Sequence, residues 1–479
     1  MIKLFNKGKT DTVLPSNLKT PGGHIDVLDG LRGLAILLVL WFHLWQLTWF
    51  NMKFDLPNWG FLGSMAGKPL SLDFISWTGF IGVELFFFVS GFCLFYPYAQ
   101  SIWTGKRNQS LLEYTGKRFF KIVPSYLLAL LVIGIMGVSG LYVFGDAGGL
   151  KGSFSDIWPN IWSHLTFTHN LNPATEGGFT GVLWSLAVEV QFYFIFPIFA
   201  WFIRKGPIPA LLTFGGMIAI AFFYRGYYLQ AGLNNGNNFF PLHQLPAFID
   251  LFAYGMFAAW FLVLLKTKVL KIEALKFFFT VTAVLCMVGF FMLLNEGYLI
   301  RYQPNGITIW QVQNRLAFGV VLIILTIGSA FAFKFWRVIL ANKVLVFLST
   351  ISYNLYMWHQ FIIRELVTRH IGYPQNLDLQ KLTNPADEKW IWIFSLVAVV
   401  SSIAVATLIT YLFELPILNF GKNWLRKISN KRDAKKGLMV AQTSPAIPLA
   451  TLATPVEPAT DADADADEAT QAPTTDATP

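Results

Sequence analysis

The sequence predicts an all-α, polytopic membrane protein with about ten transmembrane helices and both termini in the cytoplasm. Of its 479 residues, 54% are hydrophobic and only 13% are charged, a more apolar balance than soluble domains have. Apolar runs of the length that crosses a bilayer recur along the chain. Lys and Arg concentrate in alternate connecting segments, as the positive-inside rule describes for membrane proteins.

The apolar runs define the elements in order. Residues 1–27 are polar and lack a small-residue cleavage site, so we expect a cytoplasmic segment rather than a cleaved signal peptide. Each following run is about 20 residues or longer, which a helix needs to cross a bilayer. The ten predicted spans are residues 28–49, 79–99, 119–143, 181–203, 208–228, 245–265, 275–295, 313–333, 344–366 and 390–413.

The basic residues set the orientation of these spans. With the N-terminus inside, the cytoplasmic segments carry the clusters within residues 106–121, 266–276 and 422–436. The outer segments and span ends carry fewer cations, among which we count Arg225. This alternation favours membrane topology, not nucleic-acid binding, as the meaning of the net charge of +9. We therefore expect a multi-pass protein of the cytoplasmic (inner) membrane.

Composition divides the chain into three parts. Residues 1–27 form the N-terminal segment, residues 28–420 the membrane domain, and residues 421–479 a basic juxtamembrane stretch followed by a tail. From about residue 437 the tail is rich in Ala, Thr, Pro and Asp, so we expect disorder and assign it no chemistry. The outer segments 51–78 and 144–180 are long enough to cover the mouth of a pore.

Two ionisable residues mark the first span. Arg32 and His43 are eleven residues apart, which is about three helical turns, so they share a side of the helix about 16 Å apart. Ionisable groups inside a membrane helix are costly and are usually functional. The alternative is an arginine that reaches the membrane edge and a hydrogen-bonded core histidine. The pair suggests a cation for an anionic group and, deeper in, a centre for proton transfer.

The second span carries an acid at a matching depth. Glu84 lies about five residues in from the outer side, which roughly matches the depth of His43. We expect its carboxylate to orient the imidazole and stabilise its cation. Further along the span, Ser90 and Gly91 offer a hydroxyl and a site for close helix packing, and packing is the simpler role.

Basic residues gather at the inner end of the third span. Arg118 and Lys121 are three residues apart and share a helix face. They either mark the cytoplasmic side or, together with Arg32, form a basic mouth for phosphate groups.

Later spans hold the other polar candidates. Glu189 lies about 12 Å deep by helix rise and needs a partner or a proton there. We assign Trp184, Tyr353 and His359 to the acceptor side of the pore, although His359 is also compatible with a simple interfacial position. Glu414 closes the last span at the inner face, where it can pair with a cation of the mouth.

The cysteine content is low. Cys93 and Cys286 both fall in apolar runs, so we interpret them as small core residues and not as a disulfide. The Cys and His residues do not show metal-ligand spacing, and we expect no metal.

Taken in order, these segments resemble the membrane acyltransferase 3 family, which includes bacterial O-acetyltransferases of surface polysaccharides. The resemblance runs from about residue 25 to residue 420. It rests on four motifs together: the Arg-x10-His pair, the Gly-Val-acid-Leu-Phe-Phe segment with its Ser-Gly-Phe, the Arg-x-x-basic-Ile-x-Pro segment, and the Trp-Ser-Leu segment that continues to Glu-x-Gln-Phe-Tyr.

The resemblance implies transfer of an acyl group, most simply acetyl, from cytoplasmic acetyl-CoA or another acyl-CoA to a carbohydrate or glycolipid hydroxyl of the cell envelope. Arg32 and His43 match the family's essential pair, and Arg118 and Lys121 match its basic pair. On this basis we expect His43, Glu84 and Glu189 to be catalytic. We expect Arg32, Ser90, Arg118 and Lys121 to bind the donor.

Three positions depart from the family pattern. Glu84 stands where Asp is common, which is a mild change. Lys121 stands where Arg is common, which removes the bidentate geometry of a guanidinium toward phosphate. Val190 stands where a second acid often follows. Some family members add a C-terminal esterase-like domain, so this chain either acts alone or needs a separate extracytoplasmic partner.

Two other functions remain open from the sequence alone. One is a proton-coupled transporter or exporter in which His43, Glu84 and Glu189 form the relay. The sequence has no paired inverted repeats or broken helices that would favour a transporter. The other is a membrane scaffold whose polar residues only pack.

Overall fold

The computed structural model describes residues 26–48, 53–55, 69–71, 73–105, 108–138, 154–236, 238–268, 272–375 and 389–443. The chain separates into two compact units, one ending at Leu425 and the other beginning at Arg426. Both cavities described below lie in the first unit. The expectation of disorder in the tail concerns residues from about 437, and its part beyond residue 443 lies outside the described residues.

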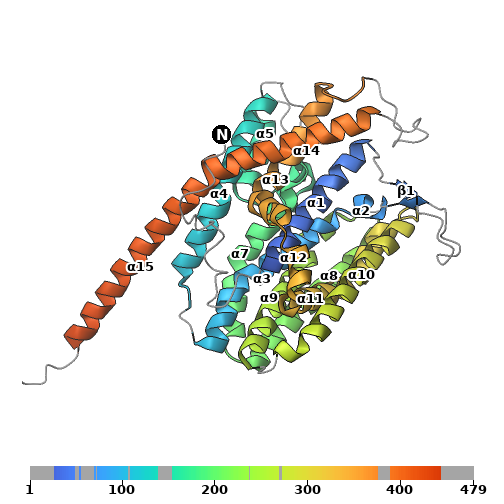
Figure 1. The fold of residues 1–479 in the computed structure, drawn as a ribbon. Helices are drawn as coiled ribbons and strands as arrows, with labels where there is room; N and C mark the ends of the chain where they lie inside the picture. The colour runs from blue at the N-terminus through green and yellow to red at the C-terminus, as the bar shows by residue number, and fades with distance from the viewer. Residues whose placement is uncertain are drawn as a thin grey trace, which may run out of the picture. The chain divides into compact units, whose positions relative to one another are not determined.

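The described residues are almost entirely helical (Figure 1). The elements are α1 (Asp26–Thr48), β1 (Lys53–Asp55), β2 (Pro69–Ser71), α2 (Asp73–Trp77), α3 (Ile81–Thr104), α4 (Leu111–Val138), α5 (Phe154–Leu165), η2 (His169–Leu171), α6 (Pro173–Glu176), α7 (Leu183–Ile203), α8 (Pro207–Asn234), η3 (Phe240–His243), α9 (Leu245–Lys268), η4 (Ile272–Leu275), α10 (Lys276–Leu299), α11 (Gly306–Phe331), α12 (Lys334–Leu340), α13 (Lys343–Thr368), α14 (Lys389–Ile409), η7 (Thr410–Glu414) and α15 (Leu415–Thr443). The two short strands pair antiparallel.

The helical membrane fold predicted from the sequence is confirmed. Within the described residues, nine helices are long and apolar enough to cross a bilayer, and the pair α12–α13, bent by 41°, makes a tenth. The predicted starts differ most at α4 and α11, which begin at Leu111 and Gly306 instead of at residues 119 and 313. Hydropathy marks the apolar part of a helix, whereas both helices begin with a more polar turn. The cytoplasmic location of the termini stays a prediction.

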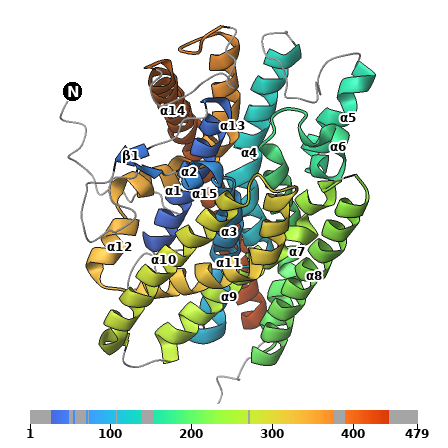
Figure 2. The ribbon, with the colours of Figure 1, turned by 90° about the vertical axis from the view of Figure 1, so that its right-hand side faces the viewer.

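The α3 helix lies in the interior of the unit, packed against α9 and α1 (Figure 2). Two glycines bring α3 and α9 together. A Cβ atom at Gly91 would lie 2.3 Å from the carbonyl oxygen of Phe252, and one at Gly255 would lie 2.0 Å from that of Phe88. Close helix packing at Gly91, which the sequence suggested, is therefore what the structure shows. In turn, α1 packs against α13, and α10 pairs with α11.

Candidate active site

Two cavities occupy the core of the first unit. The basic cavity, of about 240 Å³, is lined by apolar and hydroxyl side chains together with five cations and three carboxylates: Arg32, Lys117, Arg118, Lys121, Lys422, Asp29, Glu189 and Glu414. The histidine cavity, of about 300 Å³, is lined by His43, Glu84, Trp184, Arg315 and their neighbours. Two residues line both cavities, Val83 on α3 and Tyr356 on α13. The two cavities therefore meet at this pair.

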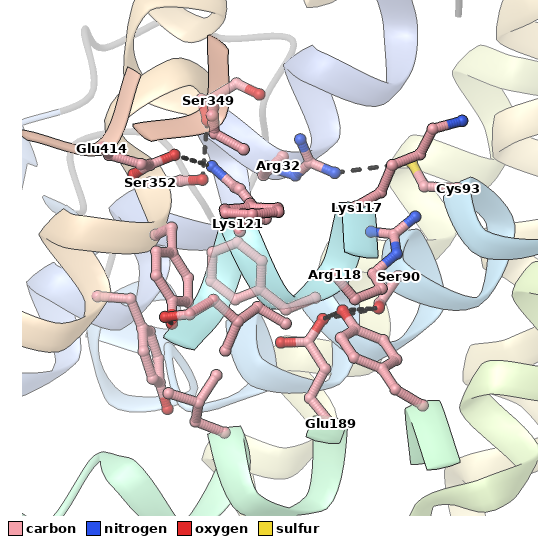
Figure 3. A pocket seen from close by; sticks show the side chains of 18 of the residues that line it. Arg32, Ser90, Cys93, Lys117, Arg118, Lys121, Glu189, Ser349, Ser352 and Glu414 are labelled. Carbon is pink, nitrogen blue, oxygen red and sulfur yellow. Dashed lines mark hydrogen bonds and ion pairs between the residues drawn. The ribbon is translucent and has the colours of Figure 1, made fainter. Parts of the chain in front are cut away.

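Cations from α1, α4 and α15 line the basic cavity, and those of α1 and α4 are drawn in Figure 3. Arg32 on α1 donates from Nη2 to the sulfur of Cys93 on α3, 3.6 Å away. Arg118 on α4 lies with its guanidinium carbon 5.5 Å from the centre of the Tyr193 ring, and its buried Nε has no hydrogen-bond partner among the described residues. The Cys93 sulfur is a weak acceptor for Arg32, and Nε of Arg118 has no acceptor in the described part of the chain, so both guanidinium groups can still donate hydrogen bonds to an anion.

The Glu189 carboxylate and the hydroxyl groups bonded to it form another wall of the basic cavity. The Ser90 hydroxyl donates to Oε1 of Glu189 at 2.6 Å, and the Tyr193 hydroxyl donates to the same oxygen. Tyr114 in turn donates to the backbone carbonyl of Tyr193 at 2.9 Å. These bonds hold Glu189 on α7 toward α3 and solvate its charge inside the protein.

Lys121 is held at the opposite side of this cavity. It forms an ion pair with Glu414 (Figure 3). Asn354 on α13 donates to the second oxygen of Glu414 at 2.6 Å, and Lys121 lies over the Tyr353 ring at 5.4 Å. Glu414 ends a π-helical stretch, Thr410–Glu414, whose wider turn interrupts the α-helical register between α14 and α15. The pairing of Glu414 with a cation of the mouth agrees with the sequence expectation.

In the histidine cavity, His43 meets a second histidine. Nε2 of His359 lies 3.2 Å from Nδ1 of His43, and the ring centres are 4.8 Å apart. Each Nδ1 also lies 2.9 Å from a carbonyl oxygen one turn back, that of Val39 for His43 and that of Leu355 for His359. Carbonyls only accept, so both Nδ1 atoms carry the proton, and Nε2 of His359 accepts from His43. This tautomer leaves Nε2 of His43 unprotonated on a ring that lines the cavity.

Glu84 has a different partner from the one expected. Its carboxylate pairs with Nη1 of Arg315 on α11 at 2.9 Å, and Gln311 donates to it at 3.4 Å. The contact that positions His43 is made by His359 instead. The expectation that Glu84 orients the imidazole is therefore corrected. The Glu84 carboxylate pairs with the buried Arg315 instead, because an ion pair offsets the cost of burying both charges.

A second buried ion pair lies beside the first. Nη2 of Arg225 on α8 is 2.8 Å from Oδ2 of Asp250 on α9, and Nη1 of Arg225 donates to the carbonyl oxygen of Ala247 at 2.7 Å. Both side chains are buried. Arg225, counted from the sequence among the outer segments and span ends, lies within α8 and is buried against Asp250.

Aromatic and polar groups line the rest of the histidine cavity. The Trp184 ring stacks on His243 at 5.4 Å between centres and lies 5.5 Å from Phe248. His243 also contacts Glu176 of α6 at 3.1 Å. The cavity thus offers a flat aromatic wall beside a strongly polar one.

Comparison with known proteins identifies this architecture. The acyltransferase 3 family model, described as an acyltransferase domain, matches residues 25–411. The chain belongs to the acyltransferase 3 family. No solved structure matches this chain.

Three named relatives illustrate the similarity of this acyltransferase 3 protein. The acyltransferase MdmB of Streptomyces mycarofaciens is 28% identical over 196 residues, 40% of this chain and 44% of that protein. Peptidoglycan O-acetyltransferase OatA of Listeria monocytogenes is 24% identical over 351 residues, 71% of this chain and 49% of that protein. Nodulation protein 10 of Rhizobium leguminosarum is 30% identical over 199 residues, 38% of this chain and 46% of that protein. The matched region thus spans just under half the length of each relative.

The fold of this acyltransferase 3 protein sorts the residues predicted from sequence into two groups. The basic cavity is lined by Arg32, Ser90, Arg118, Lys121, Glu189 and Tyr353. The histidine cavity is lined by His43, Glu84 and Trp184, and His359 lies behind His43. Glu189 and Tyr353 thus line a different cavity from the residues with which they were grouped.

Sequence reasoning missed several residues of the site. Arg225, Asp250 and Arg315 are charged and lie within apolar helices, and the cost of burying them was the signal that could have marked them. Cys93 and Tyr356 carry no such signal. Both cysteines are free thiols. Within the described ranges, no group of three or more His, Cys, Asp or Glu side chains is placed to hold a metal ion.

Proposed function

We propose that this acyltransferase moves an acyl group, in particular acetyl, from acyl-CoA in the basic cavity to a hydroxyl of a cell-envelope glycan or glycolipid in the histidine cavity. The observation that carries the proposal is the contact between the two cavities at Val83 and Tyr356. One side gathers cations suited to a nucleotide donor, and the other presents an unprotonated imidazole nitrogen. The whole arrangement would span the cytoplasmic membrane with both termini in the cytoplasm.

The residues of the basic cavity fit the donor. The phosphates of acyl-CoA would bind Arg32, Arg118 and Lys121. The Nε–H of Arg118, which has no hydrogen-bond partner in the described residues, could donate to a phosphate oxygen. Charge-assisted hydrogen bonds to phosphate are among the strongest that proteins make. The apolar walls between these cations and Tyr356 suit the thin, flexible arm that carries a thioester.

His43 would accept the proton in the transfer step. The acceptor oxygen attacks the thioester carbonyl carbon, the carbon–sulfur bond breaks, and the thiolate leaves with the bond's electron pair. The hydroxyl proton passes to Nε2 of His43 and is later returned to the thiolate. In the alternative course His43 itself attacks, carries the acyl group briefly and passes it to the hydroxyl.

The transporter hypothesis is less well supported by this geometry. A relay needs its carriers within proton-transfer reach of one another, yet Glu84 and Glu189 line different cavities. In addition, Glu84 forms an ion pair with Arg315, and Glu189 accepts hydrogen bonds from Ser90 and Tyr193. These pairs favour fixed electrostatic roles over exchange of protons.

The test uses purified full-length protein with labelled acetyl-CoA and a glycan and glycolipid extract of the producing cell. We expect CoA release and label in the extract from the parent protein, and neither from His43→Gln. His370→Asn is the matched control, because His370 is an exposed histidine that lines neither cavity, and it should behave like the parent. Label retained on the parent protein but absent from His43→Gln would indicate the covalent course. Equal transfer by the parent and His43→Gln would refute the assignment.

A further inference from the structure

The contact between the two cavities is a partition made by two side chains. Val83 immediately precedes Glu84 on α3, and Tyr356 lies three residues before His359 on α13. Both belong to one apolar cluster with Ile36, Val39 and Val182. A group that passes from the basic cavity to His43 at this point moves past Val83 and Tyr356.

Tyr356 is tethered across the partition. Its hydroxyl donates to the carbonyl oxygen of Val182 at 3.0 Å and shares a hydrogen bond with the Ser185 hydroxyl at 2.5 Å, both on the α7 side. The ring also meets Phe86 edge-on at 5.8 Å between centres. These contacts hold the phenol in place, so it does not swing aside readily.

Val83 is equally constrained. The preceding residue, Gly82, lies so close to α1 that a Cβ atom there would be 2.3 Å from the carbonyl oxygen of Ala35. The α3 helix therefore cannot move closer to α1 at this point. Because both sides are fixed, the width of the passage depends on the size of the valine side chain and the phenol ring.

We propose that Val83 and Tyr356 set the length of the acyl chain that this protein transfers. The inference rests on the proposed function. An acetyl group places a single methyl beyond the carbonyl, whereas each further methylene must displace the valine or the tethered ring. Tightly packed interiors resist such added volume. Enzyme pockets discriminate by about 10- to 200-fold for each methylene.

The experiment measures CoA release from acetyl-, propionyl- and butyryl-CoA by inverted membrane vesicles of the producing cell, which hold the natural acceptor. Release by His43→Gln vesicles is subtracted as background. We expect the parent to prefer acetyl-CoA by about tenfold or more per methylene. Val83→Ala should raise the ratio of propionyl to acetyl turnover about tenfold. Val83→Ile should lower turnover of acetyl-CoA itself.

Val89→Ala is the matched control, since it makes the same change at a buried valine of the same helix that lines neither cavity. Its ratio should equal that of the parent. A parent that uses butyryl-CoA as well as acetyl-CoA, or a Val83→Ala ratio no greater than that of Val89→Ala, would overturn the inference while leaving acyl transfer intact. No release above background by the parent with any donor would instead refute the proposed function.

Discussion

At the scale of single residues, the protonation of two imidazoles decides what the histidine cavity can do. The i−4 carbonyl bonds of His43 and His359 fix the proton on Nδ1 of each ring. Nε2 of His359 then carries no proton and accepts a hydrogen bond from Nδ1 of His43. Through this contact, which is made away from the reacting atoms, His359 acts as a positioning residue that keeps Nε2 of His43 basic.

We predict that His359→Phe lowers kcat about tenfold while leaving the KM for acetyl-CoA nearly unchanged. A lost hydrogen bond of about 1–1.5 kcal/mol corresponds to about this factor. His359→Gln should recover much of the rate, because its amide oxygen can accept from Nδ1 of His43. Steady-state kinetics of the three proteins decide this. If the glutamine variant is as slow as the phenylalanine variant, and the helix is intact, the orienting role is disproved.

A second prediction at this scale concerns the donor. Arg118→Ala should weaken CoA binding by about 10- to 150-fold, since a charge-assisted hydrogen bond contributes about 1.5–3 kcal/mol. Titration calorimetry of the purified protein measures it. Lys121→Ala is expected to weaken binding and also to lower thermal stability, because it leaves the buried carboxylate of Glu414 without its cation. Unchanged affinity in the double variant would place the donor elsewhere.

At the scale of elements, two helices connect the cavities. The α3 helix carries Val83 and Glu84 at one end and Ser90 and Cys93 further along, so it lines both. The α13 helix does the same with Tyr353 and Tyr356, which are three residues apart and share a face. Because each helix is continuous, a shift of either one moves groups in both cavities together.

The segment from α5 to α6 allows a prediction about pH. His164 and His169 are buried and stack with ring centres 3.9 Å apart. Burial lowers the pKa of His169 to about 4, and burial together with the neighbouring imidazole lowers the pKa of His164 well below its usual value. The Tyr126 hydroxyl donates to the carbonyl oxygen of His164 at 3.1 Å, which ties the segment to α4.

Since the folded state holds His169 neutral, the unfolded segment binds more protons between pH 6.5 and pH 4. Its stability should therefore fall as the pH is lowered through this range, by up to about 1.4 kcal/mol per pH unit for each histidine. Hydrogen exchange of residues 154–180 at pH 7 and pH 5 measures the change. The protection factors, which are exchange rates corrected for the intrinsic rate at each pH, should be lower at pH 5 than at pH 7 in the parent and should change less in His169→Phe. Equal protection factors at both pH values would contradict the prediction.

At the scale of the whole molecule, the buried charges compensate one another. Arg315 is matched by Glu84, Arg225 by Asp250 and Lys121 by Glu414. Such pairing offsets the cost of placing ions in a low-dielectric interior. Arg32 contacts the Cys93 sulfur and Arg118 faces the Tyr193 ring, and the donor site is expected at these two side chains.

The last prediction concerns the C-terminal unit. The residues that line either cavity end at Leu425. Truncation after Gly437 should therefore leave transfer by the purified protein within about a factor of two, or about 0.5 kcal/mol in the barrier. A rate assay against the full-length protein tests it. A large loss in a correctly folded truncated protein would show that the tail supports the membrane unit.

The sequence by itself determined the number and approximate extent of the spans, because apolar length is a local property that the bilayer selects. It also marked Arg32, His43, Glu84 and Glu189, since a charged or titratable residue inside an apolar run stands out without any structure. Only the tertiary structure decided which of these residues act together. His359 contacts His43 across 316 residues of chain, and Arg315 takes the carboxylate expected to serve His43. The choice of partner depends on helices brought together by packing, and for that reason neither spacing nor composition contains it.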